Sequence, residues 1–397
     1  MKLLEIIASV DPAGGGPLEG IIRQDAACRA AGQSVVRELV TLDPPGSPFL
    51  VDFPMTVHAL GRPQSGAGDP LRRALDHWGY TPDLAPWLRE NISRYDAVIV
   101  NGLWNYAPFA ASRVLPGSST PYFVFTHGMM DPWFKQTYPL KHLAKQAFWL
   151  ISEGRLLAGA RSVFFTCEEE RRKARGQFLG HSKYSETVVG YGAVAPPPRA
   201  PALDAAFRAA TPGLGERDYL LFLSRIHPKK GCDLLIEAFA KVASERPHID
   251  LVMTGPDQTG WRPELEALAE RLGVATRVHW TGPLYGDAKW GALYGAQAFA
   301  LPSHQENFGI AVAEALGCGT PVLISNQVDI WREIAKAGAG LVEPDTVDGA
   351  TALLQRWFDL PAARRAAMSA TAVELFNAQF NVGRTGPALI RTIQELL

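Results

Sequence analysis

The chain has 397 residues, a length that is long for one hydrophobic core and suits two domains. Its 39 Lys and Arg residues balance 40 Asp and Glu residues, so its net charge does not favour nucleic acid as a partner. The four cysteines have no Cys-x-x-Cys spacing, which argues against a zinc site or a disulfide framework and is typical of a cytoplasmic protein. No uncharged apolar run reaches the roughly 20 residues that cross a bilayer, and Glu5 interrupts the apolar N-terminus, which therefore predicts a first strand and not a signal peptide.

The N-terminal part alternates apolar strands with helices. A strand over residues 2–10 precedes a loop with three glycines, and Pro17 suits the first turn of a helix over residues 18–31. Further buried strands are expected over residues 34–42, 96–101, 122–126 and 162–166. Residues 43–90 are rich in Pro and Gly, and their pattern assigns no element.

A stiff connector with three consecutive prolines occupies residues 190–201. The alternation then resumes with strands over residues 218–224, 249–254, 277–281, 298–301 and 321–324. Helices over residues 232–244 and 264–272 lie among them. Two such series predict an α/β protein with two Rossmann-like doubly wound domains, residues 1–195 and 196–379, that face each other across a cleft.

Two glutamates, Glu306 and Glu314, stand eight residues apart around a predicted helix over residues 308–316. At a rise of ~1.5 Å per residue they are separated by ~12 Å, roughly the reach from a sugar hydroxyl across a diphosphate to a ribose. Carboxylates accept hydrogen bonds from pairs of hydroxyls, so the spacing favours a nucleotide-sugar ligand. The alternative is one capping glutamate and one solvated helical glutamate.

Two cations follow the strand over residues 218–224. Arg225 and Lys230 come at its carboxyl end, directly before the next helix, where α/β sheets bind ligands. Fixed cations beside a helix N-terminus can clamp a diphosphate. Lys229 is an alternative to Lys230 in this role, and a solvated basic loop is the alternative to the clamp.

The stretch from Glu306 to Glu314 resembles the Glu-seven-residues-Glu signature of family 4 retaining glycosyltransferases, which have the GT-B fold. The segment from Ser224 to Gly231 is similar to the donor-phosphate motif of that family. The resemblance implies that Glu306 binds the donor sugar, Glu314 the ribose, and Arg225 and Lys230 the diphosphate. It also implies retention at the anomeric carbon and a last helix, about residues 380–397, that packs on the first domain.

The resemblance implies further donor contacts within and beyond the glutamate motif. Those residues are Asn307, Phe308, Gly309, Gly255, Gly282 and Leu284. The glycines end two strands and would let the backbone approach a flat base. Because the chain has no Asp-x-Asp pair, we expect transfer without a metal ion and without a cofactor.

The glycine loop after the first strand contains Gly14, Gly15 and Gly16, whose backbone amides could face an anion. Its spacing has one residue too many for a dinucleotide fingerprint, which argues against a Rossmann oxidoreductase. Glu19 would repel phosphate, so the loop is expected to face acceptor hydroxyls. A mere turn is the alternative.

His127 and Asp131 follow the strand over residues 122–126. Similar His-Gly-Met-x-Asp-Pro-Trp segments occur in family members that build bacterial polysaccharides. The resemblance implies that His127 donates to the sugar or helps at the reacting centre, and that Asp131 lines the acceptor side. A structural histidine is the alternative.

The predicted helix over residues 139–151 has apolar and basic sides. It is either a packed surface helix or a contact with the inner face of a membrane. Together these features predict a transferase that moves a hexose-type sugar from a nucleotide-diphosphate donor to a glycan or lipid-linked saccharide. A nucleotide-sugar epimerase of the same fold is the alternative.

Overall fold

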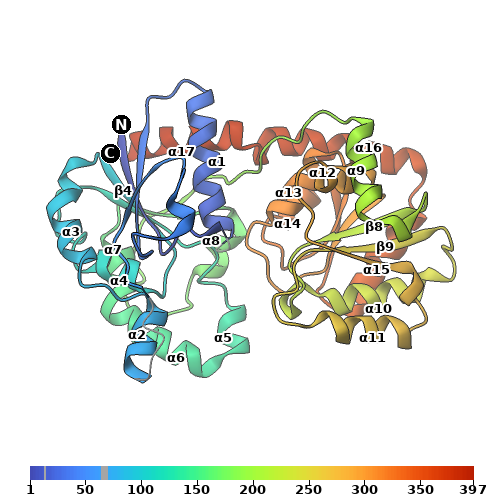
Figure 1. The fold of residues 1–397 in the computed structure, drawn as a ribbon, viewed down its shortest axis with the longest axis horizontal. Helices are drawn as coiled ribbons and strands as arrows, with labels where there is room; N and C mark the ends of the chain where they lie inside the picture. Colours follow the sequence, from blue (N-terminus) through green and yellow to red (C-terminus); the bar gives the residue numbers. More distant parts are fainter. Residues whose placement is uncertain (13–14, 64–69) are drawn as a thin grey trace. The chain divides into compact units, whose positions relative to one another are not determined.

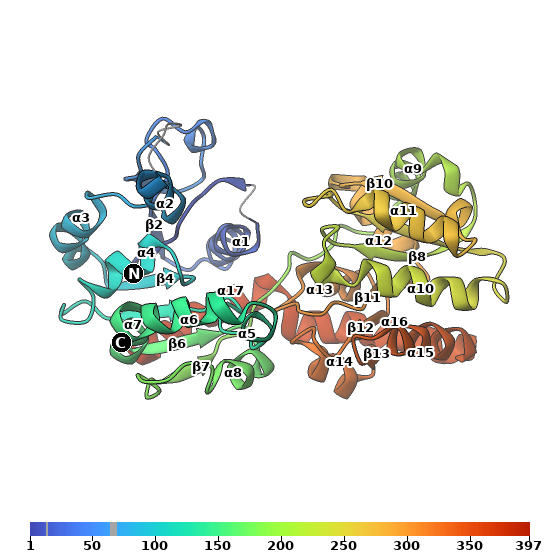
Figure 2. The ribbon, with the colours of Figure 1, turned by 90° about the horizontal axis from the view of Figure 1, so that it is seen from below.

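The structure, a computed structural model, describes residues 1–12, 15–63 and 70–397, so Gly14 lies outside the described residues. The chain divides into two units (Figure 1). Unit 1 comprises Met1–Tyr191 and Val382–Leu397, and unit 2 comprises Gly192–Asn381. Each unit contains one parallel sheet with helices on both of its faces (Figures 1 and 2), which confirms the predicted class of two Rossmann-like α/β domains.

Unit 1 has the strand order β3-β2-β1-β4-β5-β6-β7, with every neighbouring pair parallel. The strands are β1 (Lys2–Ile6), β2 (Val36–Thr41), β3 (Thr56–Ala59), β4 (Ala97–Asn101), β5 (Tyr122–Phe125), β6 (Ser162–Phe165) and β7 (Glu186–Val188). The chain reverses its direction of travel across the sheet between β1 and β4, and such a switch point is where doubly wound sheets bind ligands. The sequence pattern missed β3 and β7, short strands at the sheet edges, because they lack a continuous apolar run.

The helices of unit 1 cover both faces of its sheet. They are α1 (Gly16–Ala30), α2 (Pro70–Trp78), α3 (Leu84–Asn91), α4 (Tyr106–Ser112), α5 (Trp133–Thr137), α6 (Pro139–Phe148), α7 (Gly154–Gly159), α8 (Glu168–Ala174) and α17 (Val382–Leu396). One face of the sheet packs Leu3, Ile99 and Phe123 against Ile393 of α17, which lies along α1. The other face packs against α3, α4 and α7. The α-helix predicted over residues 139–151 ends at Phe148 and continues as a π-helical turn, Trp149–Glu153.

Unit 2 has the strand order β10-β9-β8-β11-β12-β13, again with parallel pairs. The strands are β8 (Asp218–Leu223), β9 (Ile249–Thr254), β10 (Val278–Gly282), β11 (Ala298–Leu301), β12 (Val322–Ser325) and β13 (Gly340–Glu343). The helices are α9 (Pro201–Ala210), α10 (Cys232–Ala243), α11 (Arg262–Arg271), α12 (Gly286–Gly295), α13 (Ile310–Gly317), α14 (Trp331–Ala337), α15 (Val347–Asp359) and α16 (Ala362–Leu375). The switch point of this sheet lies between β8 and β11.

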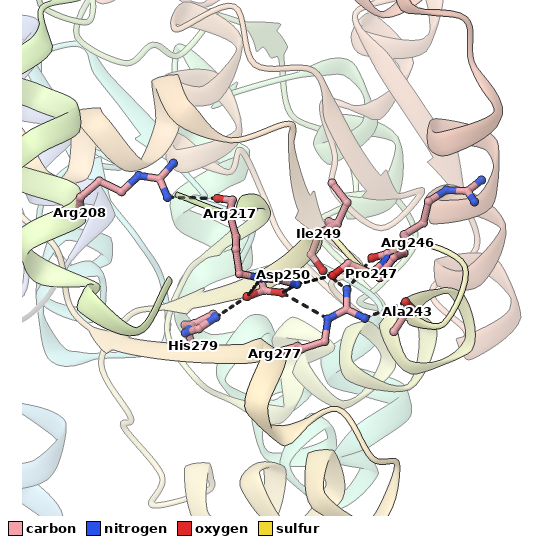
Figure 3. A network of polar contacts seen from close by, with 9 residues as sticks. All are labelled: Arg208, Arg217, Ala243, Arg246, Pro247, Ile249, Asp250, Arg277 and His279. Carbon is pink, nitrogen blue, oxygen red and sulfur yellow. Dashed lines mark hydrogen bonds and ion pairs between the residues drawn. The ribbon is translucent and has the colours of Figure 1, made fainter. Parts of the chain in front are cut away.

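A polar network joins the amino ends of the strands in unit 2 (Figure 3). Asp250, the second residue of β9, is 1% exposed and accepts from Arg217 at 2.8 Å, His279 at 2.8 Å and Arg277 at 3.3 Å. Arg277 also donates to the carbonyl of Ala243 at the end of α10. Burial alone would raise the pKa of Asp250, but these donors outweigh it and hold the pKa below its usual range. The network therefore stabilises the sheet at the amino ends of its strands, at the opposite end from the carboxyl ends where ligands bind.

Candidate active site

A partly buried ion pair spans the switch point of unit 2. Lys230 follows β8 and Glu306 follows the neighbouring strand β11, and the Lys230 ammonium donates to Glu306 Oε2. The Lys230 side chain is only 5% exposed. Gly231 allows this approach, because a Cβ at that position would lie 2.2 Å from the carbonyl oxygen of Pro302. The structure thus brings together two of the residues that the sequence singled out.

The charges around Glu306 keep its carboxyl group ionised. Burial acts to raise the pKa of Glu306, but the positive charges of Lys230, Lys229 and Arg225 outweigh it, so the pKa lies below its usual value. Arg225 is exposed, and its Nη1 donates to Gln258 Oε1 at 3.0 Å. The loop after β8 therefore gathers a positive field around one carboxylate. This field suits an anionic ligand.

The two lysines of this loop have different surroundings. Lys230 is buried against Glu306, whereas Lys229 is partly exposed and its carbonyl oxygen accepts from the backbone of His304 at 2.9 Å. Ser303 Oγ donates to the same carbonyl at 2.9 Å. These two bonds to the Lys229 carbonyl join the loop after β8 to the loop after β11, which fixes the position of both lysines.

The backbone of Glu306 is tied to the loop after β12. Its N–H donates to the carbonyl of Gln327 at 3.0 Å, and its carbonyl accepts from the N–H of Asp329 at 2.9 Å. The α-helix predicted to begin at Phe308 begins at Ile310 instead, because Gly309 adopts the left-handed conformation with φ 73°. Glu306 therefore lies in the loop before α13, held by backbone bonds on both sides.

The residues between Glu306 and α13 differ in their surroundings. Phe308 is 4% exposed and packs edge-to-face against Phe380, with ring centroids 5.6 Å apart. A Cβ on Gly309 would lie 3.2 Å from Glu306 Cγ, so a side chain there would crowd the Glu306 side chain. Asn307 is partly exposed. The structure gives Phe308 and Gly309 packing positions that shape the loop, and neither offers a side chain to a ligand.

Glu314 lies inside α13 and is 3% exposed. Lys289 of α12 donates to Glu314 Oε1 at 2.9 Å. Lys289 was not among the residues predicted from the sequence. Lys289 is an ordinary helical lysine in the sequence, and Glu314, the residue it pairs with, is 25 residues away, so no local pattern links the two.

The glycines expected near a nucleobase end neighbouring strands of unit 2. The N–H of Gly255 after β9 donates to the carbonyl of Gly282 at the end of β10, at 2.9 Å. A Cβ on Gly255 would lie 1.8 Å from the carbonyl oxygen of Ser224, so no larger residue fits. Leu284 is partly exposed, and Tyr285 is 76% exposed. The backbone here is closely packed, with apolar side chains beside it.

In unit 1, His127 follows β5 with φ 48°, a left-handed conformation that is uncommon for a residue with a side chain. Its ring stacks on Phe125 with centroids 5.0 Å apart. Its Nε2 lies 3.0 Å from Oδ1 of Asn101, the last residue of β4. Burial lowers the pKa of His127 to about 4, so the imidazole is neutral at pH 7.

A buried carboxylate, Glu170 of α8, holds the loop that carries His127. Its Oε1 accepts from the N–H of Gly128 at 2.6 Å and from Thr126 Oγ1 at 2.7 Å, on either side of the histidine. Its Oε2 accepts from the N–H and the hydroxyl of Thr166, each at 2.7 Å. Glu170 stands in a run of three glutamates that is typical of a solvated helix, so the sequence pattern did not reveal its buried role.

Asp131 is buried in the turn before α5. Its Oδ1 accepts from the N–H of Trp133 at 2.8 Å, and its Oδ2 lies 3.7 Å from Lys173 Nζ. These contacts fix the turn between His127 and α5. The structure therefore places Asp131 four residues from the histidine and already engaged within unit 1.

The glycine loop of unit 1 leads into α1. Gly15 has φ 81° and precedes the helix, and the carbonyl of Gly16 accepts from the Tyr191 hydroxyl at 3.1 Å. Glu19 is exposed and pairs with Arg23 one turn along the helix. The loop is thus near Tyr191, while the carboxylate of Glu19 faces solvent.

Two kinds of feature are absent from the described residues. Over residues 1–12, 15–63 and 70–397, no group of three or more His, Cys, Asp or Glu side chains could hold a metal ion. Within the same ranges, no helix combines the length and the apolar character needed to cross a membrane.

Two doubly wound units, with charged and polar side chains at the carboxyl ends of their strands, place the chain in a class of two-domain α/β proteins whose ligands bind at those strand ends. The family model described as Glycosyl transferase 4-like domain matches residues 16–192. The model described as Glycosyl transferases group 1 matches residues 205–374. The two matches together cover most of the chain, and the chain belongs to the family 4 glycosyltransferases of the GT-B fold, as its glutamate motif predicted.

Curated relatives match part of the chain. The D-inositol 3-phosphate glycosyltransferase of Rhodococcus opacus is 36% identical over 171 residues, which is 41% of this chain and 38% of the relative. That of Segniliparus rotundus is 38% identical over 125 residues, which is 30% of this chain and 27% of the relative. The matches thus span less than half the length of these relatives. Neither protein is named as an epimerase.

Solved structures match the whole chain in fold. Sucrose-phosphate synthase of Thermosynechococcus elongatus has a TM-score of 0.74 at 18% identity and covers 100% of this chain and 98% of its own. HepE of Anabaena in complex with UDP has a TM-score of 0.75 at 16% identity and covers 100% of both chains. At these identities the likeness establishes the fold.

Proposed function

We propose that this protein transfers a sugar from a nucleoside-diphosphate donor to a hydroxyl of a glycan or lipid-linked saccharide. The observation that carries the proposal is the ion pair between Lys230 and Glu306 at the switch point of unit 2. Doubly wound sheets bind nucleotides at that place, and a glycosyl donor needs both a cation for its diphosphate and an acceptor for its sugar hydroxyls.

The donor binds unit 2, Gly192–Asn381. Lys230 and Arg225 offset the negative charge that develops on the departing diphosphate, and Glu306 accepts hydrogen bonds from hydroxyls of the sugar. Glu314 accepts from the ribose. In the structure Lys230 bonds to Glu306 and Lys289 to Glu314, so both carboxylates are already paired with lysines. Donor binding exchanges part of these contacts for contacts with phosphate and hydroxyl groups.

The charge of the leaving group is offset by side chains, without a divalent ion, and the anomeric configuration is retained. The positive field of Arg225, Lys229 and Lys230 supports the first statement, because it lies where a diphosphate would need it. The resemblance of the glutamate motif to retaining enzymes supports the second. Unit 1 binds the acceptor through the loops that carry Gly15, Gly16 and Asp131, with Glu19 at their rim, and His127 meets the reacting hydroxyl.

We further propose that unit 1 rests on an anionic membrane surface. The leucine patch, defined as Leu140, Leu143, Leu150 and Leu179, has exposed fractions between 48% and 80%. Leu179 lies beside α6, because its N–H and carbonyl both bond to the side chain of Gln146. The exposed lysines Lys135 and Lys141 stand in the same region of the chain and would attract anionic headgroups.

The test is binding and turnover with defined nucleotides. UDP is the first to try, because HepE was solved with UDP and with UDP-glucose. We expect one of UDP, GDP, ADP and dTDP to raise the midpoint of thermal unfolding, with the same rise in EDTA. The matching nucleotide sugar should then release its nucleoside diphosphate only when an acceptor is added. Release without acceptor, accompanied by isomerised donor, would point to an epimerase and contradict the proposal.

A further inference from the structure

Four side chains of unit 1 form a hydrogen-bonded chain that ends at His127. Arg37 of β2 donates from Nη1 to Oε1 of Glu5 on β1, at 3.0 Å. Oε2 of Glu5 accepts from Nδ2 of Asn101 at 2.8 Å, and Oδ1 of Asn101 lies 3.0 Å from Nε2 of His127. Arg37, Glu5 and Asn101 are all buried, each at most 5% exposed. The four residues come from four different strands or strand ends, so only the folded sheet assembles them.

The direction of each of these hydrogen bonds follows from Arg37, the first of the four residues. A guanidinium group only donates, so the atom of Glu5 that faces Arg37 must be an acceptor. Asn101 in turn donates from Nδ2 to the other oxygen of Glu5, Oε2, at 2.8 Å, so its NH2 group faces Glu5. Its carbonyl oxygen then faces His127, and Nε2 of the histidine must carry the hydrogen.

The geometry points to Glu5 and Asn101 as positioning residues that hold His127 in its neutral Nε2–H tautomer. This inference rests on the role of His127 in the proposed transfer. A neutral imidazole has one N–H, so Nδ1 carries a lone pair. No residue in the described part of the chain bonds to Nδ1, and the ring keeps some exposed surface. His127 therefore offers a substrate only a hydrogen-bond acceptor, which selects a hydroxyl that donates and disfavours a phosphate oxygen.

A small cavity adjoins these residues. Its volume is about 10 Å³, and its lining includes Glu5, Gln24, Asn101, His127 and Tyr191. The pKa of Glu5 is raised by burial although Arg37 opposes the shift. Because Asn101 is buried and donates to Glu5, the carboxylate of Glu5 sets the orientation of the amide.

The substitution Glu5→Gln is expected to reverse the direction of the hydrogen bonds from position 5 through Asn101 to His127. Arg37 still requires an acceptor, so the new side-chain amide must turn its oxygen toward Arg37 and its NH2 group toward Asn101. Asn101 must then present its oxygen to position 5 and its NH2 group to His127. Nε2 becomes the acceptor, and the hydrogen moves to Nδ1. We expect the transfer rate kcat to fall at least about tenfold, because Nδ1 no longer accepts.

The experiment measures the tautomer directly. Ring nitrogen-15 chemical shifts of histidine distinguish a protonated nitrogen from an unprotonated one, and the spectrum of His127→Gln identifies which of the nine histidines is His127. We expect Nε2–H in the wild-type chain and Nδ1–H in Glu5→Gln. Affinity for UDP, which unit 2 binds in the proposed function, should be unchanged and serves as the control for folding.

The outcomes separate this inference from the proposed function. If the hydrogen of the His127 ring is found on Nδ1 in the wild-type protein, the inference is overturned. The same tautomer in wild type and in a folded Glu5→Gln overturns the role of Glu5. If the tautomer reverses but no nucleotide sugar is turned over by wild type, the positioning holds and the proposed transfer fails.

Discussion

Lys230 and Glu306, 76 residues apart in the sequence, form an ion pair across the switch point of the sheet in unit 2. Neither residue is on a strand. Each lies in a loop that follows one of two adjacent parallel strands, β8 and β11, and the closeness of those strands brings the charges together. In the proposed site, Lys230 binds the diphosphate and Glu306 binds the sugar, so the ion pair links the two binding positions directly.

Removal of either charge should disable the site. In Lys230→Ala and in Glu306→Ala we expect transfer to fall by at least about 100-fold, because the diphosphate or the sugar loses its partner. The free energy of unfolding should also fall, by about 1–3 kcal/mol, because the remaining charge is largely buried. Steady-state kinetics and urea unfolding measure the two effects.

Lys229→Ala is the matched control for Lys230→Ala. Its side chain is more exposed, and the bonds to its carbonyl survive the substitution. We expect most of the activity to remain. If Lys229→Ala abolished transfer and Lys230→Ala did not, the assignment of the phosphate ligand would be reversed.

Glu314 should control affinity for the nucleotide. We expect Glu314→Gln to weaken UDP binding by about tenfold or more, because the ribose hydroxyls lose a charged acceptor. Lys289→Met keeps the carboxylate and removes the lysine that pairs with it, so UDP should bind at least as tightly as in wild type. Titration calorimetry measures both. Equal affinity in Glu314→Gln and wild type would remove Glu314 from the ribose site.

Glu170 should stabilise the loop that presents His127. Each carboxylate oxygen of Glu170 accepts two hydrogen bonds. Glu170→Gln replaces one of these oxygens with an NH2 group, which cannot accept. We therefore expect the free energy of unfolding to fall by about 2–3 kcal/mol. Glu168→Gln, on the exposed side of the same helix, should cost less than about 1 kcal/mol. Urea unfolding compares them. Equal losses would mean that the buried network contributes no more than a surface pair.

Asp250 should make stability depend on acid pH. Its pKa in the folded state lies below its value of about 3.9 in an unfolded chain. The stabilisation is therefore present above about pH 4 and is lost as the pH falls through the folded-state pKa. The difference in unfolding free energy between wild type and Asp250→Asn should be largest near neutral pH and shrink in acid. For Asp348→Asn, whose side chain is 97% exposed, we expect a small difference at every pH.

The leucine patch should bind anionic vesicles. We expect wild-type protein to float with vesicles that contain anionic lipid, and less of it to float with neutral vesicles or at high salt. The double substitution Leu140→Ser and Leu143→Ser should reduce flotation, whereas Val51→Ser, at a site 72% exposed elsewhere in unit 1, should not. Wild-type protein that stays entirely in the soluble fraction would disprove the membrane contact.

Much of the fold was predictable because parallel strands buried on both faces require continuous apolar runs, such as residues 97–101 and 298–301. The predicted site residues followed from the same pattern. Arg225, Lys230 and His127 each come just after such a run, at the strand ends where ligands bind. The short edge strands β3 and β7 could not be predicted, because half-exposed strands of three or four residues have little pattern.

The sequence by itself determined the alternation of strands and helices, the glutamate spacing of the family motif, and the order of charged residues along the chain. Only the tertiary structure decided the partners of those residues: Lys289 for Glu314, Glu170 for the His127 loop, and Glu5 for Asn101. The physical reason is that these contacts depend on strand order and register. Glu5 and Asn101 are 96 residues apart and meet because β1 and β4 are neighbours in the sheet.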